Sequence, residues 1–193
     1  MSRATSHPDL EQQYDSVERA LHWITVLLVV TLYLLAQVWG FFTKPTADQL
    51  VEIHISFGLL LAAIVLVRLF WRLTFGRRLP AVESGLMGLA ATIGHIILYL
   101  LLVCTIGLGL CMHWAADGRA NFFALFTIAS PFPINHDLGH DLLPFHFWVA
   151  TALIVMAAGH ALMALFHYYV LQDGTLQRML PRLAARKERC SAK

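Results

Sequence analysis

The sequence predicts an all-α integral membrane protein, a four-helix bundle with both termini in the cytoplasm. The first observation behind this prediction is composition. Of the 193 residues, 58% are hydrophobic and only 13% are charged, and the mean hydropathy is +0.64. A soluble domain usually devotes about a quarter of its residues to charged side chains, because its surface faces water. The composition therefore indicates that lipid surrounds most of this chain.

The second observation is that four apolar stretches are long enough to cross a bilayer, which takes about 20 residues of helix. These stretches lie at residues 20–42, 53–73, 89–112 and 145–171. No internal repeat, low-complexity segment or soluble domain accompanies them. We therefore expect residues 1–193 to form one transmembrane domain whose helices pack as a bundle.

The third observation is the distribution of cations, which predicts the orientation. Twelve of the 14 lysines and arginines lie in the N-terminal segment, around the end of the second span, or in the C-terminal tail. The opposite side keeps only Lys44 and Arg119. By the positive-inside rule, both termini then lie in the cytoplasm. We interpret the basic tail as a topology determinant or a contact with anionic lipid, not with nucleic acid.

The longest connection, residues 114–144, mixes aromatic residues and prolines with the run HDLGHD. We expect it to include a short helix lying at the membrane interface. His136 and His140 have the i, i+4 spacing of a zinc-binding pair, with Asp137 or Asp141 as a further ligand. Because two histidines without a clear third ligand fall short of a good zinc site, polar loop residues are the favoured interpretation.

The ten histidines are the main candidates for function, because histidine is uncommon in lipid unless it has a partner or a ligand. His22 lies near the cytoplasmic end of the first span, and His54 near the outer end of the second. His146 and His160 are fourteen residues apart on the fourth span. Fourteen residues make about four helical turns, so these two side chains share a face and are separated by ~21 Å.

These depths predict two layers of paired imidazoles. His22 can meet His160 on the inner side of the membrane, and His54 can meet His146 on the outer side. Neutral imidazole is a good axial ligand for haem iron, so the pattern favours two haems, one at each level. The sequence contains no CxxCH motif, which indicates that the haem is not covalently attached.

Other side chains leave alternatives open. His95 and His113 are eighteen residues apart, which is five turns, so they share a face of the third span and compete for the same role on spacing alone. The alternative interpretation of His95 and His113 is that each forms hydrogen bonds near the membrane interface and binds no haem. Arg68 lies at the inner level, where it either pairs with a haem propionate or extends to the cytoplasmic lipid headgroups.

Five segments together resemble the bacterial cytochrome b561 family. They are RALHW, EIHISFG, GHIILYLL, HFWVATALIVMAAGHALMALFHYY and the closing DGTLQRMLPR. The resemblance covers residues 19–182 and implies a multi-pass protein of the bacterial inner membrane that binds two haem b groups. It implies His22 and His160 as ligands of the inner iron, and His54 and His146 as ligands of the outer iron.

The resemblance also implies an oxidoreductase that oxidises superoxide at the outer face and passes the electrons to ubiquinone. On that face, however, the two cations stand against five carboxylates, which disfavours electrostatic steering of an anion. One alternative is a cytochrome b subunit that carries electrons between a dehydrogenase, or another donor protein, and the quinone pool. An alternative of another class is a metal transporter or sensor that uses the histidines to bind metal or protons.

A quinone-binding residue is expected near the inner end of the fourth span. His167 is the candidate, because an imidazole can both hydrogen-bond a quinone carbonyl and carry a proton. The adjacent Tyr168 and Tyr169 are typical of the aromatic belt at a membrane interface.

Overall fold

The structure of the protein, a computed structural model, describes residues 14–76, 85–123 and 125–180. Four long helices dominate it, and all four are long and apolar enough to cross a membrane. This confirms the predicted fold class. The helices are α1 (Ser16–Val38), α2 (Lys44–Thr74), α3 (Gly85–Asp117) and α4 (His136–Phe166).

Short elements extend or connect these helices. They are η2 (Trp39–Phe41), the strands β1 (Arg119–Phe122) and β2 (Phe126–Ala129), η3 (His167–Leu171) and η4 (Leu176–Arg178). The helix η3 is a π-helix that continues α4. The two strands form an antiparallel hairpin between α3 and α4.

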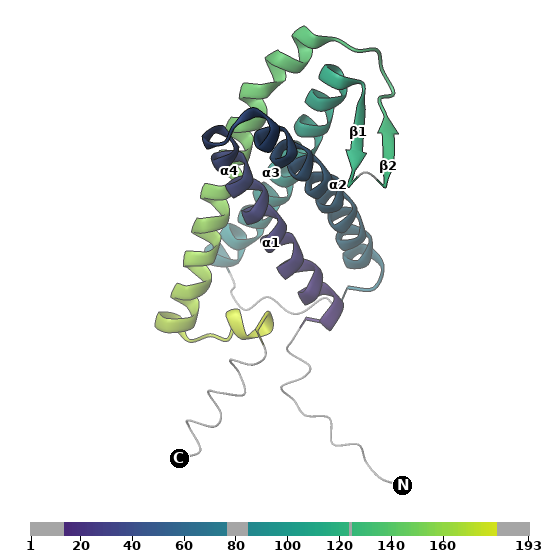
Figure 1. Cartoon of the computed structure of the whole chain (residues 1–193). Coiled ribbons are helices and arrows are strands. Elements are labelled where there is room, and N and C mark those ends of the chain that lie inside the picture. The colour runs from purple at the N-terminus through teal and green to yellow at the C-terminus, as the bar shows by residue number, and fades with distance from the viewer. Residues whose placement is uncertain (1–13, 77–84, 124, 181–193) are drawn as a thin grey trace.

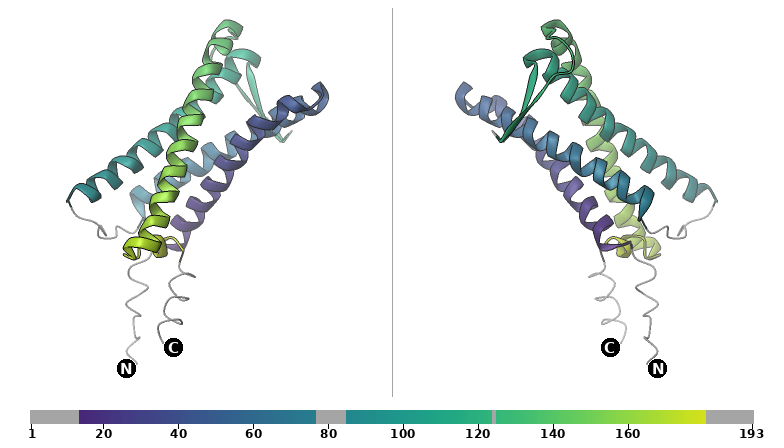
Figure 2. Two further views of the ribbon diagram at one scale, coloured as in Figure 1. Left: turned by 90° about the vertical axis from the view of Figure 1, so that its left-hand side faces the viewer. Right: turned by 90° about the vertical axis from the view of Figure 1, so that its right-hand side faces the viewer.

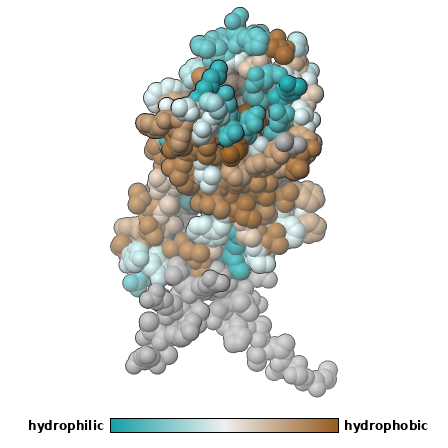
Figure 3. All heavy atoms as spheres, viewed as in Figure 1, coloured by the Kyte–Doolittle hydropathy of each residue, from teal (hydrophilic) through white to brown (hydrophobic). Residues whose placement is uncertain are grey.

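The helices pack as two pairs, α1 with α2 and α3 with α4, and the pairs cross one another (Figures 1 and 2). A cluster of buried residues from all four helices holds the pairs together. It consists of Leu28, Leu32, Leu61, Val65, Leu102 and Leu153. On the face drawn in Figure 3, hydrophobic residues make up the middle of the molecule and hydrophilic residues gather near the hairpin. This pattern is typical of a bundle whose outer surface faces lipid.

The start of α1 and the short helix η4 lie at the same end of the bundle (Figure 1), where Trp23 Nε1 donates to the carbonyl of Met179 at 3.4 Å. We call this the terminal end and the opposite one the hairpin end. The sequence predicts the terminal end to be cytoplasmic. Many of the cations behind that prediction lie outside the described residues, namely Arg3, Arg77, Arg78, Arg182, Arg186, Lys187, Arg189 and Lys193.

Each of the four helices begins before the corresponding apolar span. For α1 and α4, a polar cap starts the helix outside the apolar run. The side chain of Asp15 accepts a hydrogen bond from the Glu18 amide before α1, and that of Asn135 accepts one from the Leu138 amide before α4. Such caps satisfy amides that have no partner in the first helical turn. The helix α4 also runs through Pro144 rather than beginning after it.

The expectation of a short interfacial helix in residues 114–144 was wrong. The β1–β2 hairpin and the first turns of α4 occupy most of this segment. Ser56 of α2 ties the hairpin down, since its hydroxyl donates to the Asn121 carbonyl at 3.2 Å and accepts from the Phe123 amide at 2.9 Å. The Phe123 ring also packs edge-on against Phe57, with ring centroids 5.4 Å apart. These contacts satisfy backbone groups that would otherwise be unpaired near lipid.

Candidate functional site

The hairpin end brings together two of the predicted histidines. His54 of α2 and His146 of α4 face each other, with ring centroids 6.4 Å apart and ring planes at 83°. A metal ion that binds two imidazole nitrogens at about 2 Å each would hold the ring centroids roughly 6 Å apart. The observed spacing is therefore suitable for one metal ion between the two rings.

Hydrogen bonds set the tautomer of both rings. Nδ1 of His54 lies 3.1 Å from the carbonyl oxygen of Leu32, and Nδ1 of His146 lies 3.1 Å from that of Thr105. A carbonyl oxygen can only accept, so Nδ1 carries the hydrogen in each ring. The lone pair of Nε2 is then available for a metal, which is how metal-binding histidines are commonly oriented.

A cavity of about 710 Å³ surrounds this pair, and residues from all four helices line it. Two glycines shape its wall. Gly58 has no neighbour within 4 Å of where a Cβ would stand, whereas a Cβ on Gly109 would lie 2.8 Å from Cε1 of His146. Glycine lets the backbone approach a ligand or a ring closely. The size of the cavity lies within the range for small-molecule and cofactor sites, and its imidazoles are the ligands that haem iron needs.

His113 lines the same cavity. Its Nδ1 lies 3.0 Å from a carboxylate oxygen of Asp117, one turn further along α3, so the two form an ion pair when the histidine is protonated. His113 is thus a polar residue on the wall of the cavity.

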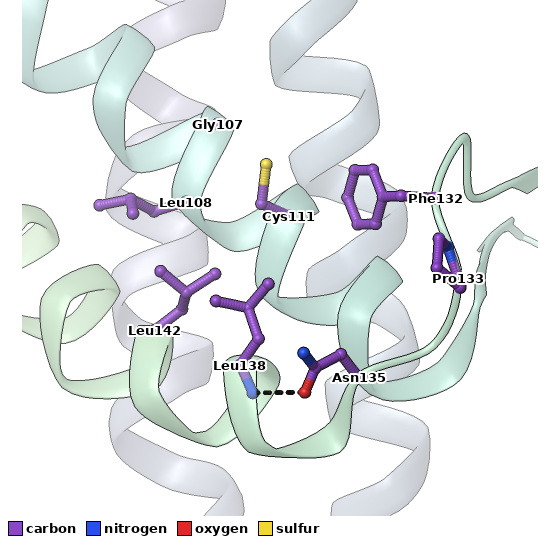
Figure 4. Close-up of a pocket in the computed structure, with 8 residues that line it drawn as sticks. All are labelled: Gly107, Leu108, Cys111, Phe132, Pro133, Asn135, Leu138 and Leu142. Carbon is purple, nitrogen blue, oxygen red and sulfur yellow. Dashed lines mark hydrogen bonds between the residues drawn. The ribbon is translucent and has the colours of Figure 1, made fainter.

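A smaller cavity of about 530 Å³ lies between α3, the segment before α4 and the first turns of α4 (Figure 4). Its walls are mainly apolar, with Cys111 and Asn135 among them. The Asn135 side chain is already used as the cap of α4 (Figure 4). None of the described residues that line this cavity is a histidine, so it does not resemble the imidazole site.

At the terminal end, polar side chains from all four long helices lie close together. Arg68 Nη2 lies 3.0 Å from Nδ1 of His22, and the Arg68 guanidinium carbon lies 5.4 Å from the centroid of the Tyr99 ring. The rings of His95 and His160 have centroids 5.1 Å apart. These side chains belong to α1, α2, α3 and α4. The structure therefore places His22 and His160 in one cluster, but the ring packed against His160 is His95.

The contact with Arg68 gives His22 a tautomer different from that of the hairpin-end pair. A guanidinium can only donate, so Nδ1 of His22 accepts and the hydrogen of the neutral ring is on Nε2. Binding a metal through Nε2 would require this contact to change. Two buried atoms of the cluster, Arg68 Nε and Tyr99 Oη, have no hydrogen-bond partner among the described residues. A partly buried cation with an unpartnered donor suits an anionic group such as a haem propionate.

His167 lies buried at the start of η3, with 9% of its surface exposed. Its Nδ1 is hydrogen-bonded to Asp173, whose other carboxylate oxygen accepts from the amide and the hydroxyl of Thr175 at 2.9 and 2.7 Å. Burial would raise the pKa of the Asp173 carboxyl, but hydrogen bonds from His167 and Thr175 outweigh it and hold the pKa below its usual value. The carboxylate therefore stays ionised beside the imidazole.

Sequence reasoning missed Asp173, although a signal was present. The run Asp-Gly-Thr after an apolar span is typical of a turn in which the aspartate side chain accepts from the chain two residues later. The two remaining candidates, His136 and His140, lie in the first turns of α4. His140 Nδ1 is 4.0 Å from Asp141, and both of these side chains are exposed. Among residues 14–76, 85–123 and 125–180, no group of three or more metal-binding side chains comes together.

The fold and the site define a class of protein, a membrane-spanning helical bundle with a pair of facing imidazoles in a cavity inside it. Comparison with known proteins agrees, because the family described as "Prokaryotic cytochrome b561" matches residues 13–182. The chain belongs to this family, and it is thereby a membrane electron-transfer protein of a family that binds haem b.

Several curated relatives cover nearly the whole chain. A protein of Yersinia pestis named "Probable superoxide oxidase CybB" is 27% identical over 177 residues, which make up 90% of this chain and 98% of the relative. "Cytochrome b561 homolog 2" of Escherichia coli is 29% identical, over 91% of this chain and 95% of the relative. "Cytochrome b561 homolog 1" of the same organism is 30% identical, over 88% and 98% respectively.

Proposed function

We propose that this chain carries electrons across the bacterial inner membrane through two non-covalently bound haem b groups, from superoxide at the hairpin end to ubiquinone at the terminal end. The observation that carries the proposal is the His54–His146 pair, with its ring spacing of 6.4 Å, inside a cavity lined by all four helices. Haem supplies one-electron redox chemistry when bound. Helices α1, α2 and α4 would supply its ligands and fix its orientation.

At the hairpin end, His54 and His146 would bind the iron through Nε2. The carbonyls of Leu32 and Thr105 hold both rings in the required tautomer. With both imidazoles bound to it, the iron would have no position left for a further ligand, so a donor such as superoxide would give up its electron without binding the metal. The name of the relative from Yersinia pestis supports superoxide as that donor.

At the terminal end, His22 and His160 would bind the second iron, as the resemblance implies. Arg68 would then turn from His22 to a propionate, which uses its unpartnered Nε and frees Nδ1 of His22. His95 is the alternative partner for His160, because the two rings are in contact and Nδ1 of His95 donates to the Ala91 carbonyl at 2.7 Å. Replacement of each histidine separately decides between the two assignments.

Ubiquinone needs two electrons and two protons to become the quinol. His167 is suited to pass a proton to the quinone because an imidazole has two ring nitrogens. Its Nδ1 is hydrogen-bonded to Asp173, which leaves Nε2 to face a quinone oxygen. Asp173 acts through His167 and is thus a positioning residue rather than a group that contacts the quinone.

A protein donor is the second candidate at the hairpin end, because the charge there favours it. Among the described residues at the hairpin end, the cations are Lys44 and Arg119, and the carboxylates outnumber them. A surface with excess negative charge attracts a basic protein rather than superoxide. These carboxylates are Asp48, Glu52, Asp117, Asp137 and Asp141.

The first test is to measure haem in the purified protein and its variants. We expect b-type absorbance bands and a haem-to-protein ratio near two. His54→Ala and His146→Ala should deplete the same haem, whereas His22→Ala and His160→Ala should deplete the other. His95→Ala should keep both. Loss of the second haem from His95→Ala, with retention in His22→Ala, would reverse the terminal-end assignment.

The second test addresses the electron donor. Rapid mixing of the oxidised protein with superoxide should reduce the haem faster than mixing with a quinol does. Reduction by quinol alone, with no response to superoxide, would contradict the proposed donor and leave electron transfer through the haems intact. A protein that binds metal ions but remains colourless with ample haem would instead support the transporter or sensor alternative.

A further inference from the structure

Two polar contacts join α1 and α2 at the terminal end, one turn apart. In the first, Arg72 Nη1 donates to Glu18 Oε1 at 2.8 Å. In the second, Arg68 lies 3.0 Å from His22. On each helix the two residues have i, i+4 spacing, so they stack on one face of α1 and one face of α2. Glu18 is thus one helical turn from a histidine that we propose as a haem ligand.

Glu18 is unusually buried for a carboxylate. Only 2% of the residue is exposed, and its second carboxyl oxygen, Oε2, is buried without a hydrogen-bond partner among the described residues. A buried carboxyl oxygen with no donor is costly while the group is charged, and the cost falls when the group binds a proton. Its partner Arg72 is half exposed, with 51% of its side chain accessible. Arg72 therefore lies between the buried carboxyl group of Glu18 and the water at the terminal end.

Other charged groups near Glu18 do not compete for this role. Arg72 and Arg68 act on it from α2, and a guanidinium group only donates hydrogen bonds, so neither has an acceptor atom that could take up a proton in place of Glu18. Asp15 precedes it on α1, but that carboxylate caps the helix by accepting from the Glu18 amide and also accepts from the indole of Trp71 at 3.2 Å. Of these four charged residues, Glu18 is the acid with a buried carboxyl oxygen, Oε2, that accepts no hydrogen bond from the described residues.

We propose that Glu18 is a proton-exchange site linked to the electron on the terminal-end haem. When the iron at that level gains one electron, the carboxylate of Glu18 gains one proton from water at the terminal end. When the iron is oxidised, it loses that electron and Glu18 returns the proton to the water. The physical reason is charge balance, because an added negative charge in a medium of low dielectric is compensated most readily by a proton on a nearby buried acid. The inference rests on the proposed function, since it needs a haem at this level.

Redox titration at a series of pH values tests the proposal. In the wild type, the midpoint potential of the terminal-end haem should fall as pH rises, by up to about 59 mV per tenfold change in proton activity for one proton per electron. In Glu18→Gln, which keeps the shape and removes the titration, this dependence should disappear. Asp48→Asn is the matched control, because Asp48 is an exposed acid in the first turns of α2 at the hairpin end. That variant should retain the slope.

Infrared spectroscopy supplies a second readout on the same samples. The spectrum of the reduced protein minus that of the oxidised protein should contain a protonated-carboxyl band that Glu18→Gln lacks. If Glu18→Gln does not assemble, Glu18→Asp keeps a carboxyl on a shorter side chain and should shift the band. A slope that persists in Glu18→Gln, or a wild-type spectrum without the band, would overturn this inference alone. A wild-type protein without haem at the terminal end would overturn the proposed function with it.

Discussion

Replacing Gly109 by alanine should damage the hairpin-end site through a single methyl group. A Cβ at this position would lie 2.8 Å from Cε1 and 3.2 Å from Nδ1 of His146. Carbon atoms in favourable contact are about 3.5–4.0 Å apart, so the ring must move by roughly 0.7 Å. It cannot simply rotate away, because the Thr105 carbonyl holds its Nδ1 at 3.1 Å.

Inserting a methyl group into a closely packed site typically costs about 1–3 kcal/mol. If this cost acts on the haem-bound state, haem binding at the hairpin end should weaken roughly 5- to 150-fold. The assay is titration of haem into the protein, together with the electron paramagnetic resonance signal of the low-spin iron, which reports the geometry of the two imidazoles. We expect the haem-to-protein ratio to fall towards one when haem is limiting.

Gly107→Ala is the matched control, two residues earlier on α3. Apart from the backbone of its own helical turn and its two chain neighbours, no atom lies within 4 Å of the Cβ that this variant would carry. Both substitutions add about the same helix propensity, roughly 1 kcal/mol, so any general gain in stability is shared. If Gly109→Ala binds haem as tightly as Gly107→Ala and gives the same resonance signal, the His146 ring is not a ligand in the position described.

Two further predictions concern stability. Ser56→Ala should leave the Asn121 carbonyl and the Phe123 amide unpaired and lower stability by about 1–3 kcal/mol, seen as a lower thermal midpoint in detergent; an unchanged midpoint would show that the hairpin does not depend on this hydroxyl. Asp173 has a pKa below its usual value in the folded protein, so its carboxylate stabilises the fold near neutral pH and this contribution is lost as pH falls through the folded pKa. Asp173→Asn should thus lower the thermal midpoint at neutral pH and reduce the further loss below about pH 4. Parallel curves of midpoint against pH for the two proteins would contradict the role of the His167 contact.

The apolar runs predict which segments lie in lipid better than they predict where helices begin. The helices α2 and α4 start at Lys44 and His136, well before the apolar spans at 53–73 and 145–171. Hydrophobicity reports the solvent around a segment, whereas a helix begins where a cap satisfies its first amides. Two such start signals stand in the sequence, namely Pro45 in the first turn of α2 and the capping residue Asn135 before α4.

Depth along each helix predicts which histidines share a level, but not which rings meet. At the hairpin end, the predicted partners His54 and His146 do face each other. At the terminal end, the ring of His95 packs against His160, and His22 lies against Arg68 instead. The rise per residue sets the height of a side chain on its own helix, while the distance to another helix depends on how the two pairs cross.

Hydropathy and residue spacing are enough to predict that the chain belongs in a membrane, that it has four segments able to cross it, and that histidines lie at two depths. These properties follow from local hydrophobicity and helical rise, which need no knowledge of the other segments. Three other features become visible only in the packed helices: Ser56 holds the hairpin, Glu18 is buried beside Arg72, and Gly109 makes room for His146. Each of these depends on the distance between side chains far apart in the chain, and that distance is set by helix packing.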